Sequence, residues 1–390
     1  MDLISTAERL AAIDRSAVTF HQERCLHSRD KYANCEQCLG LCPLEAIQSG
    51  KPPSLETKLC VNCLACLPVC PTGAYSADDA LPALLNCAAR ADAKKVELVC
   101  ELHPHAELGI PGIDLGLQIR GCLAGLGLGA YLALISLGFE QVIARTDVCQ
   151  ECPFGAVKPH IEAQIVSAKR LLEPWDWAGR LSTPMEDDFT AERPLWDAEN
   201  PPLSRRDLFR LASRQSQLAA ARIIAKDEGE AGKRPPRERR RVISAMQHLP
   251  DMEKDANLNL EKLGFAFLSV STECSACKAC ARACPSGCLQ THQNEESHFT
   301  LEFTPQACTG CGICAHVCAP GAITIDRSPT FEQVFGSQEA VTLIEADLIR
   351  CQRCNASFFS AGGNRLCPPC EFRRQNPFGS RLPPGFKVNK

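Results

Sequence analysis

Apolar and polar positions along residues 96–172 alternate as the short strands and longer helices of an α/β domain do. Short apolar runs at 96–99 and 141–145 predict strands, and the helical spacing of 161–172 predicts a closing helix. The glycine-rich run 121–139 carries no charge and is near the lower length limit for crossing a bilayer. Because its glycines weaken a membrane helix, we expect a buried helix of the α/β domain there and no membrane span.

Residues 176–262 contain no cysteine and no sustained period, which indicates a linker between domains. Within it, residues 204–225 predict one helix that opens on a Ser-x-x-Asp capping box. Residues 226–241 are almost all charged and include two prolines, so they predict a disordered, charged hinge. We expect its basic part, 233–241, either to dock an acidic partner or to remain a solvated tether.

Cysteine is the outlier of the composition, with 26 copies in 390 residues, and it points to disulfides, metal sites or clusters. The first residues include Glu8, Arg9 and Asp14 and show no signal-peptide core, so we expect a cytoplasmic protein with reduced thiols. Disulfides are therefore not expected. The net charge of −4 also argues against a protein that coats nucleic acid or an anionic membrane.

The cysteines fall into four groups, and only Cys87 and Cys288 stand outside them. In chain order the groups are Cys25, Cys35, Cys38, Cys42, Cys60, Cys63, Cys66 and Cys70; Cys100, Cys122, Cys149 and Cys152; Cys274, Cys277, Cys280, Cys284, Cys308, Cys311, Cys314 and Cys318; and Cys351, Cys354, Cys367 and Cys370. They predict four domains, at residues 20–80, 81–175, 263–335 and 345–380.

Three runs, beginning at Cys60, Cys274 and Cys308, have the spacing C-x2-C-x2-C-x3-C. In this spacing one tight loop gives three thiolates to a [4Fe–4S] cluster, and the fourth ligand comes from elsewhere. The run from Cys308 departs slightly, because an alanine separates its last cysteine from the usual proline. The N-terminal run departs more, since nine residues separate Cys25 from Cys35 instead of two. We expect Cys25 to close that cluster from a longer loop, and an unidentified group is the alternative.

These runs resemble bacterial two-cluster [4Fe–4S] ferredoxins, in which the last cysteine of each run ligates the cluster of the other run. The resemblance implies duplicated β-α-β units with two [4Fe–4S] clusters in each module. It implies four ligand sets: Cys25, Cys35, Cys38 and Cys70; Cys42, Cys60, Cys63 and Cys66; Cys274, Cys277, Cys280 and Cys318; and Cys284, Cys308, Cys311 and Cys314. Apolar patches such as those at Ile47 and Tyr75 fit the short strand expected after each run.

The second cysteine group follows the ends of predicted strands, where open α/β sheets bind ligands. This layout is similar to that of the small iron–sulfur (delta) subunit of methyl-viologen-reducing hydrogenases. The similarity implies a [2Fe–2S] cluster on Cys100, Cys122, Cys149 and Cys152. A zinc site, or cysteines that only pack, are the alternatives.

Two other features near this group have alternative interpretations. His103 and His105 are candidate ligands, although loop histidines are more often simply exposed. The segment Gly125-Leu-Gly127-Leu-Gly129-Ala130 fits G-x-G-x-x-A, a dinucleotide fingerprint, but no clear strand leads directly into it.

The last group consists of two CxxC pairs, Cys351 with Cys354 and Cys367 with Cys370, separated by twelve residues. Two such pairs on facing turns make a tetrahedral site of four thiolates, which suits zinc or a single iron as in rubredoxin. The short gap favours a zinc ribbon.

Together these features predict an α+β protein: two 2[4Fe–4S] ferredoxin-like modules flanking a small α/β domain, with a zinc-ribbon-like tail. We expect four [4Fe–4S] clusters, one [2Fe–2S] cluster and one zinc. The expected function is transfer of low-potential electrons to or from a redox-enzyme partner, of the formate dehydrogenase or hydrogenase type by analogy. We expect no enzyme activity and no nucleic-acid partner. The rival interpretation is an iron–sulfur maturation factor or redox-sensing regulator.

Overall fold

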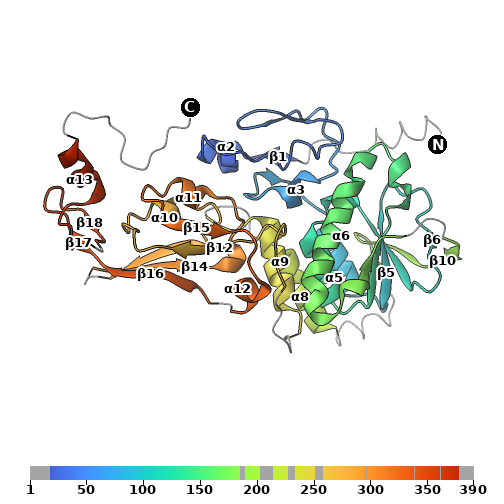
Figure 1. Ribbon diagram of the computed structural model, residues 1–390. Coiled ribbons are helices and arrows are strands. Elements are labelled where there is room, and N and C mark those ends of the chain that lie inside the picture. Colours follow the sequence, from blue (N-terminus) through green and yellow to red (C-terminus); the bar gives the residue numbers. More distant parts are fainter. Residues whose placement is uncertain are drawn as a thin grey trace. The chain divides into compact units, whose positions relative to one another are not determined.

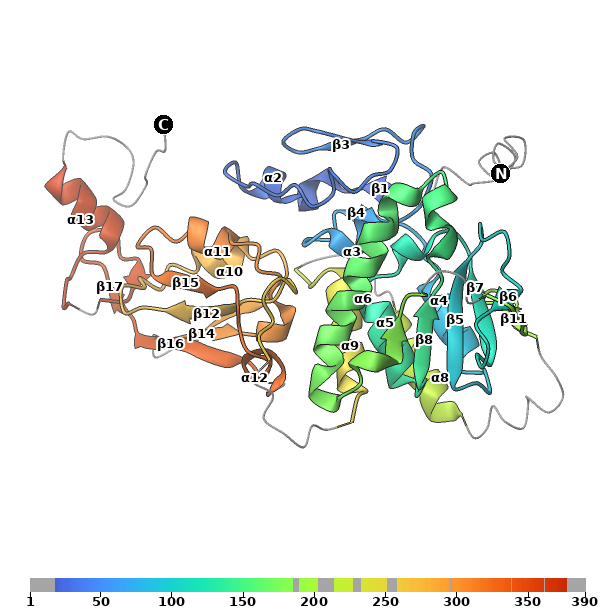
Figure 2. The same ribbon diagram turned by 45° about the vertical axis from the view of Figure 1, so that its right-hand side comes forward.

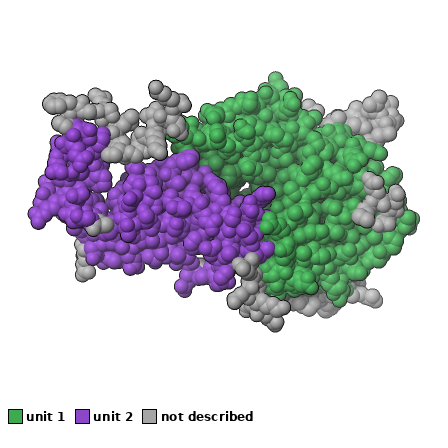
Figure 3. All heavy atoms as spheres, in the orientation of Figure 1, with its two compact units in different colours: residues 1–230, 236–255 green, residues 231–235, 256–390 purple. Residues whose placement is uncertain are grey.

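The computed structural model describes residues 18–184, 189–202, 214–226, 233–250, 258–294, 297–337, 339–360 and 362–376. The chain forms two compact units, one of residues 1–230 with 236–255 and the other of residues 231–235 with 256–390 (Figure 3). The first unit holds the N-terminal cysteine module and the middle domain, and the second holds the later module and the tail. Helices and strands are mixed in both units, as the sequence predicts.

The N-terminal module contains two short antiparallel strand pairs joined by cysteine-bearing loops (Figure 1). β1 (Thr19–Phe20) pairs with β4 (Tyr75–Ser76), and β2 (Ile47–Gln48) pairs with β3 (Ser54–Leu55). Since β2 and β4 each follow a cysteine run, the short strands predicted there are confirmed. The helical turns are η1 (Gln22–Arg24), α2 (Leu26–Arg29) and α3 (Cys66–Val69).

The middle domain is built on a five-stranded parallel sheet with the order β11-β7-β5-β8-β9 (Figure 2). Its strands are β5 (Lys95–Cys100), β7 (Leu115–Ile119), β8 (Gln141–Ala144), β9 (Leu181–Ser182) and β11 (Leu195–Asp197). The three inner strands are almost entirely buried, as parallel strands covered on both faces are. The chain passes from β7 on one side of β5 to β8 on the other, which creates a switch point at the carboxyl ends of these strands.

Three helices pack on this sheet: α4 (Leu81–Ala88) contacts β7, α5 (Leu128–Ser136) contacts β8, and α6 (Lys158–Leu172) contacts β9. The uncharged run 121–139 forms the turn η2 (Leu123–Gly125) and then α5, which has nine residues and is buried, as expected. No helix among the described residues is long and apolar enough to span a bilayer. The remaining elements are β6 (Leu108–Gly109), paired with β10 (Ala191–Glu192), and the turns η3 (Asp147–Glu151), η4 (Gly155–Val157), η5 (Glu173–Trp175) and η6 (Ala178–Arg180).

The segment 176–262 differs from the predicted linker, because much of it folds onto the middle domain. It supplies the edge strands β9 and β11 and two helices, α8 (Gln215–Ala225) and α9 (Arg237–Gln247). α8 packs on α4, and α9 packs along α5. The capping box expected in residues 204–207 lies outside the described residues.

The disordered, charged hinge expected over 226–241 is wrong at its C-terminal end, where α9 begins at Arg237. This helix buries Val242, Ala245 and Met246 along one side, and it also buries Arg241. An arginine is rarely buried unless it is paired, and here Arg241 meets a carboxylate of the first module, as described below. The many charged residues of this segment obscured the apolar positions of the helix in the sequence pattern.

The later module pairs β12 (Phe267–Val270) with β15 (Ile323–Asp326) and adds a three-stranded antiparallel sheet. That sheet has the order β13 (Leu289–Gln293), β14 (His298–Phe303) and β16 (Val341–Asp347). β16 lies beyond the predicted boundary at residue 335, so the module is longer than expected. Its helical elements are α10 (Ala279–Ala283), η7 (Pro305–Ala307), α11 (Ile313–His316) and α12 (Phe331–Phe335).

The tail begins directly after β16 with a small hairpin. β17 (Ile349–Arg350) pairs with β18 (Ser357–Phe358), and α13 (Pro368–Gln375) follows. The backbone N–H of Phe359 donates to the carbonyl of Ser275 at 3.4 Å, and the Phe359 side chain packs against the core of the later module. The tail is therefore attached to the module within the second unit.

Candidate cluster and metal sites

The three regular cysteine runs fold into loops of the same backbone shape. In each, the residues on either side of the second cysteine have positive φ, between 50° and 85°: Asn62, Leu64, Ala276, Lys278, Gly310 and Gly312. This conformation is uncommon outside glycine, and alternating it with ordinary residues curls the loop so that three thiols can face one centre. In the N-terminal run, residues 35–42, all of them described, none adopts it.

Site 1 consists of the thiols of Cys25, Cys35, Cys38 and Cys70. Burial raises the pKa of the first three thiols, and the charge of a nearby Cys70 thiolate raises each of them further. Cys25 immediately precedes α2. Although nine residues separate it from Cys35, its thiol lies near those of the other three cysteines. The structure thus gathers the set of thiols that the ferredoxin resemblance implies.

Site 2 consists of the thiols of Cys42, Cys60, Cys63 and Cys66. Burial raises the pKa of the last three, that of Cys63 to about 11, and the charge of a Cys42 thiolate adds to the effect in each. Helix α3 begins at Cys66 and is capped by Cys70, so a single turn carries one thiol into each of sites 1 and 2. The resemblance implies that the two runs exchange a ligand in this way.

Hydrogen-bond donors already surround these thiols. The backbone N–H groups of Ala46 and Ala74 donate to the Sγ atoms of Cys42 and Cys70, both at 3.2 Å. The buried hydroxyl of Tyr75 donates to Cys38 Sγ at 3.5 Å. Donors to ligand sulfur stabilise the charged thiolate and raise the potential of a bound cluster. The sequence pattern places Tyr75 only on a strand, although a tyrosine so close after a cysteine run is a signal that could indicate such a donor.

Site 3 consists of the thiols of Cys274, Cys277, Cys280 and Cys318. All four line one pocket, whose apolar wall includes Phe299, Leu301 and Ile323. Burial raises the pKa of Cys274 and Cys280, and the charges of Cys277 and Cys318 raise it further. Four converging thiols in an apolar pocket fit a bound iron–sulfur cluster.

Site 4 consists of the thiols of Cys284, Cys308, Cys311 and Cys314. Burial raises the pKa of the last two, and the charges of Cys284 and Cys308 raise it further. The sequence left Cys288 outside every group, but the structure places its Sγ 3.4 Å from Cys284 Sγ. The hydrogen bond to Cys284, a contact with Cys308 and burial raise the pKa of the Cys288 thiol well above its usual value.

Cys288 occupies a position at which the other three runs have a small, buried residue. It lies four residues after the last cysteine of its run, where the others have Ala46, Ala74 and Ala322, each at most 2% exposed. Its spacing therefore marks it as a substitution within the repeat and not as a ligand that every run requires.

The middle site gathers the four cysteines of the second group at the carboxyl ends of the sheet. Cys100 ends β5, Cys122 precedes η2 after β7, and Cys149 and Cys152 lie in and after η3, which follows β8. Burial raises the pKa of Cys100 to about 11 and of Cys149 to about 12, and the charges of neighbouring thiolates in the set add to this. The topological switch point thus brings together the four thiols that the sequence placed there.

His103 belongs to a buried polar network. Its Nδ1 accepts the backbone N–H of His105 at 3.1 Å, and its Nε2 lies 3.1 Å from both Asp147 Oδ2 and Arg145 Nη2. Arg145 donates to the same carboxylate from Nε and Nη2 at 2.9 and 3.0 Å. Burial raises the pKa of Asp147, but these bonds and charges outweigh it and hold that pKa well below its usual range. Both ring nitrogens of His103 are thus occupied, and the network steadies the turn that bears Cys149.

The glycine-rich run before α5 accommodates protein groups instead of a nucleotide. The Gly129 N–H in the first turn of α5 donates to Glu238 Oε1 at 2.6 Å, and the Leu128 N–H donates to Gln164 Oε1 at 3.1 Å. These are the amides that a phosphate would need. A Cβ on Gly127 would overlap the Glu238 carboxyl group, so glycine is needed for α9 to approach. The dinucleotide alternative is therefore wrong.

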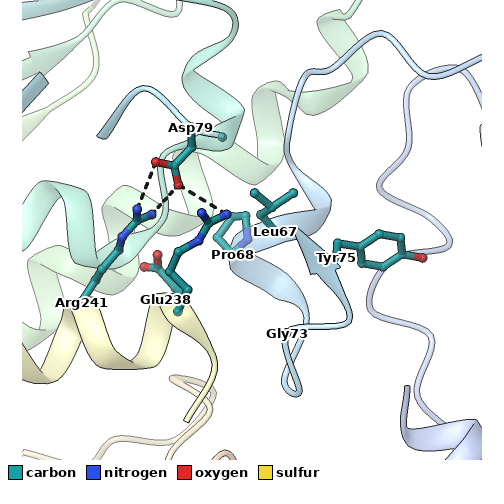
Figure 4. A pocket seen from close by; sticks show the side chains of 9 residues that line it. Leu67, Pro68, Gly73, Tyr75, Asp79, Glu238 and Arg241 are labelled. Carbon is teal, nitrogen blue, oxygen red and sulfur yellow. Dashed lines mark hydrogen bonds and ion pairs between the residues drawn. The ribbon is translucent and has the colours of Figure 1, made fainter. Parts of the chain in front are cut away.

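Glu238 belongs to a charged cluster between the first module and α9, around a small pocket that Leu67, Pro68 and Tyr75 also line (Figure 4). Arg241 donates to both oxygens of Asp79, at 2.5 and 3.0 Å, and Arg237 lies 3.7 Å from the same carboxylate. This pairing of α9 with the segment after β4 could not be found from sequence, because the partners are 162 positions apart.

The tail cysteines form the tightest set of ligand atoms. The Sγ atoms of Cys351, Cys354, Cys367 and Cys370 all lie within 4.8 Å of one another. A tetrahedral site with metal–sulfur bonds of about 2.3 Å sets the sulfurs about 3.8 Å apart, so the set fits one metal ion. Across the part of the chain that the structure describes, no other His, Cys, Asp or Glu ligand atoms gather in threes so closely.

Two family models match the chain. A 4Fe-4S dicluster domain matches residues 273–322, and a 4Fe-4S binding domain matches residues 53–76. The first contains every cysteine of sites 3 and 4, and the second contains the regular run that begins at Cys60. The irregular N-terminal run lies outside both. No curated protein matches the chain. The chain therefore carries ferredoxin-type iron–sulfur modules, which supports a general role in iron–sulfur electron transfer.

Proposed function

We propose that this protein conducts low-potential electrons through four [4Fe–4S] clusters at sites 1 to 4 and a [2Fe–2S] cluster at the middle site. The electrons pass to or from a redox-enzyme partner, of the formate dehydrogenase or hydrogenase type by analogy. When bound, such clusters supply one-electron exchange. The chain itself performs no chemistry on a substrate, and its thiols work in a reducing compartment such as the cytoplasm.

The observation that carries this proposal is the close approach of site 2 to the middle site within the first unit. Burial, the charge of Cys100 and then the charge of Cys63 raise the pKa of the Cys122 thiol, so a thiol of site 2 acts directly on the middle site. A Cβ on Gly125 would lie only 2.9 Å from the Cβ of Leu64. Because glycine has no Cβ, the η2 turn can pack directly on the site 2 loop.

Sites 1, 2 and the middle site therefore form a series. α3 joins the first two, and the contact between η2 and the site 2 loop joins the second to the third. A redox sensor needs one responsive cluster, whereas a series of adjacent sites suits transfer from one end to the other. This arrangement favours the electron carrier over the maturation or sensing role.

The tail holds one zinc ion in this proposal and has a structural role. The four closely spaced thiols support it, and Phe358 and Leu366 provide most of the apolar packing around them. Binding of the ion would then supply much of the folding free energy of so small a segment.

The experiment is iron, sulfide and zinc analysis of anaerobically reconstituted protein, combined with EPR of the reduced state. Four cubanes require about 16 iron atoms, and a [2Fe–2S] cluster adds about two. Fewer than about eight iron atoms would refute the four-cubane proposal. Full iron without reversible reduction, together with cluster-dependent binding of DNA or an apo-enzyme, would favour the sensing role instead.

A further inference from the structure

The hydroxyl of Tyr131 lies inside the middle domain beside the middle site. Tyr131 is in the first turn of α5 and is 1% exposed. Its Oη has no hydrogen-bond partner in the structure. A buried donor without a partner is costly to stability, so native proteins seldom retain one unless a bound group satisfies it.

The direction of the side chain points to that group. Side chains of a helix lean back toward its N-terminus, and the segment before α5 is η2, which starts from Cys122. Burial is the main cause that raises the pKa of Tyr131, followed by the charges of Cys122 and Cys149. Cys122 follows β7 and Cys149 follows β8, so thiols from both sides of β5 act on the hydroxyl.

Glu238 is the competing acceptor. Its charge also acts on Tyr131, but less than the charges of the two cysteines do. Its Oε1 is already bonded to the Gly129 N–H at 2.6 Å, and it makes no hydrogen bond with the tyrosine. Glu238 is therefore not the acceptor, which leaves the sulfurs of the middle site as the candidates.

A second tyrosine shows the same arrangement with its contact formed. The chain has three tyrosines, and Tyr75 donates to Cys38 Sγ of site 1 at 3.5 Å. The third, Tyr32, is 51% exposed, and its ring lies against Lys31. Two of the three tyrosines thus bring a buried hydroxyl to a set of candidate ligand thiols.

We propose that Tyr131 donates its phenolic hydrogen to a sulfur of the cluster bound at the middle site and thereby raises the reduction potential of that cluster. The inference rests on the proposed function, since it requires a cluster on these four thiols. Reduction adds negative charge to the sulfurs, so a hydrogen-bond donor stabilises the reduced form more than the oxidised form. Tyr131 thus tunes the potential of one site of the series by direct contact with its cluster.

The test is an EPR-monitored redox titration of the full chain and three matched variants. Tyr131→Phe removes only the hydroxyl, and we expect an unchanged iron content with the midpoint potential of the [2Fe–2S] signal lowered. A tenfold change in the reduction equilibrium corresponds to about 59 mV for one electron, and this is the expected size. Tyr75→Phe should shift a [4Fe–4S] signal and leave the middle one unchanged, and Tyr32→Phe should shift neither.

A second measurement keeps the test decisive if Tyr131→Phe folds poorly. Fluorotyrosine at position 131 keeps the ring in place and makes the hydroxyl a stronger donor, so the potential should rise. Unchanged potentials in both variants, with iron retained, would overturn the inference while the electron carrier stands. If Cys100→Ala instead loses no iron, there is no cluster at the middle site, and the inference fails with it.

Discussion

Replacing Asp79 by alanine should destabilise the first unit strongly, because its carboxylate pairs with the buried Arg241 and lies near Arg237, both in α9. Arg241 makes a bidentate ion pair with Asp79, and the side chains of Arg241 and Asp79 are only 6% and 4% exposed. Arg237 lies 3.7 Å from the same carboxylate. Removing one partner of a buried pair costs about 3–5 kcal/mol. Glu238 stays near both arginines and relieves part of this cost, so we expect a loss of about 3 kcal/mol.

The assay is anaerobic urea unfolding of the reconstituted protein, followed by far-UV circular dichroism and by loss of cluster absorbance. Asp92→Ala is the matched control, because its carboxylate also pairs with an arginine, Arg214 at 2.7 Å, but is 60% exposed. An exposed pair of this kind is worth less than about 1 kcal/mol. Equal effects of the two variants would refute the conclusion that α9 is anchored to the first module through Asp79.

Three further predictions concern the candidate ligands. Cys25→Ala should lose or convert one [4Fe–4S] cluster, as measured by iron analysis and EPR. The control Cys87→Ala changes a thiol buried in α4 and should keep all clusters. Full iron in Cys25→Ala would mean that another group is the ligand. Cys288→Ala should leave the iron content unchanged, since the other three runs have alanine there, and a lost cluster would make it a required ligand. Truncation after Leu348 keeps β16 and should remove about one zinc while sparing all cubanes; zinc retained by the truncated protein would contradict the tail site.

Cysteine spacing carried most of the site information, because a cluster imposes its ligand geometry on a short loop. The three regular runs follow from it directly, whereas the fourth cysteine of each set is implied by the resemblance to two-cluster ferredoxins. The apolar runs of the middle domain predicted β5, β8 and α6. The displaced Cys25 could be proposed but not located from spacing, because a nine-residue loop reaches many places.

Features that depend on contacts between distant residues were not accessible in this way. The sequence predicts a disordered, charged hinge at the arginine-rich start of α9, since nothing near it in sequence supplies Asp79. The glycines before α5 suggested a phosphate loop, because a sequence does not reveal that Glu238 caps that helix. The unpaired hydroxyl of Tyr131 is likewise visible only once the interior around it is built.

The most direct test of the account is EPR of the protein during anaerobic reductive titration and reoxidation. The account predicts that most clusters reduce and reoxidise reversibly, and that the middle-site signal becomes broadened or split once site 2 is reduced and paramagnetic. This interaction should disappear in Cys63→Ala while the sites of the second unit are unaffected. Isolated signals that never interact, or clusters that decay on reduction, would contradict a series of sites that conducts electrons.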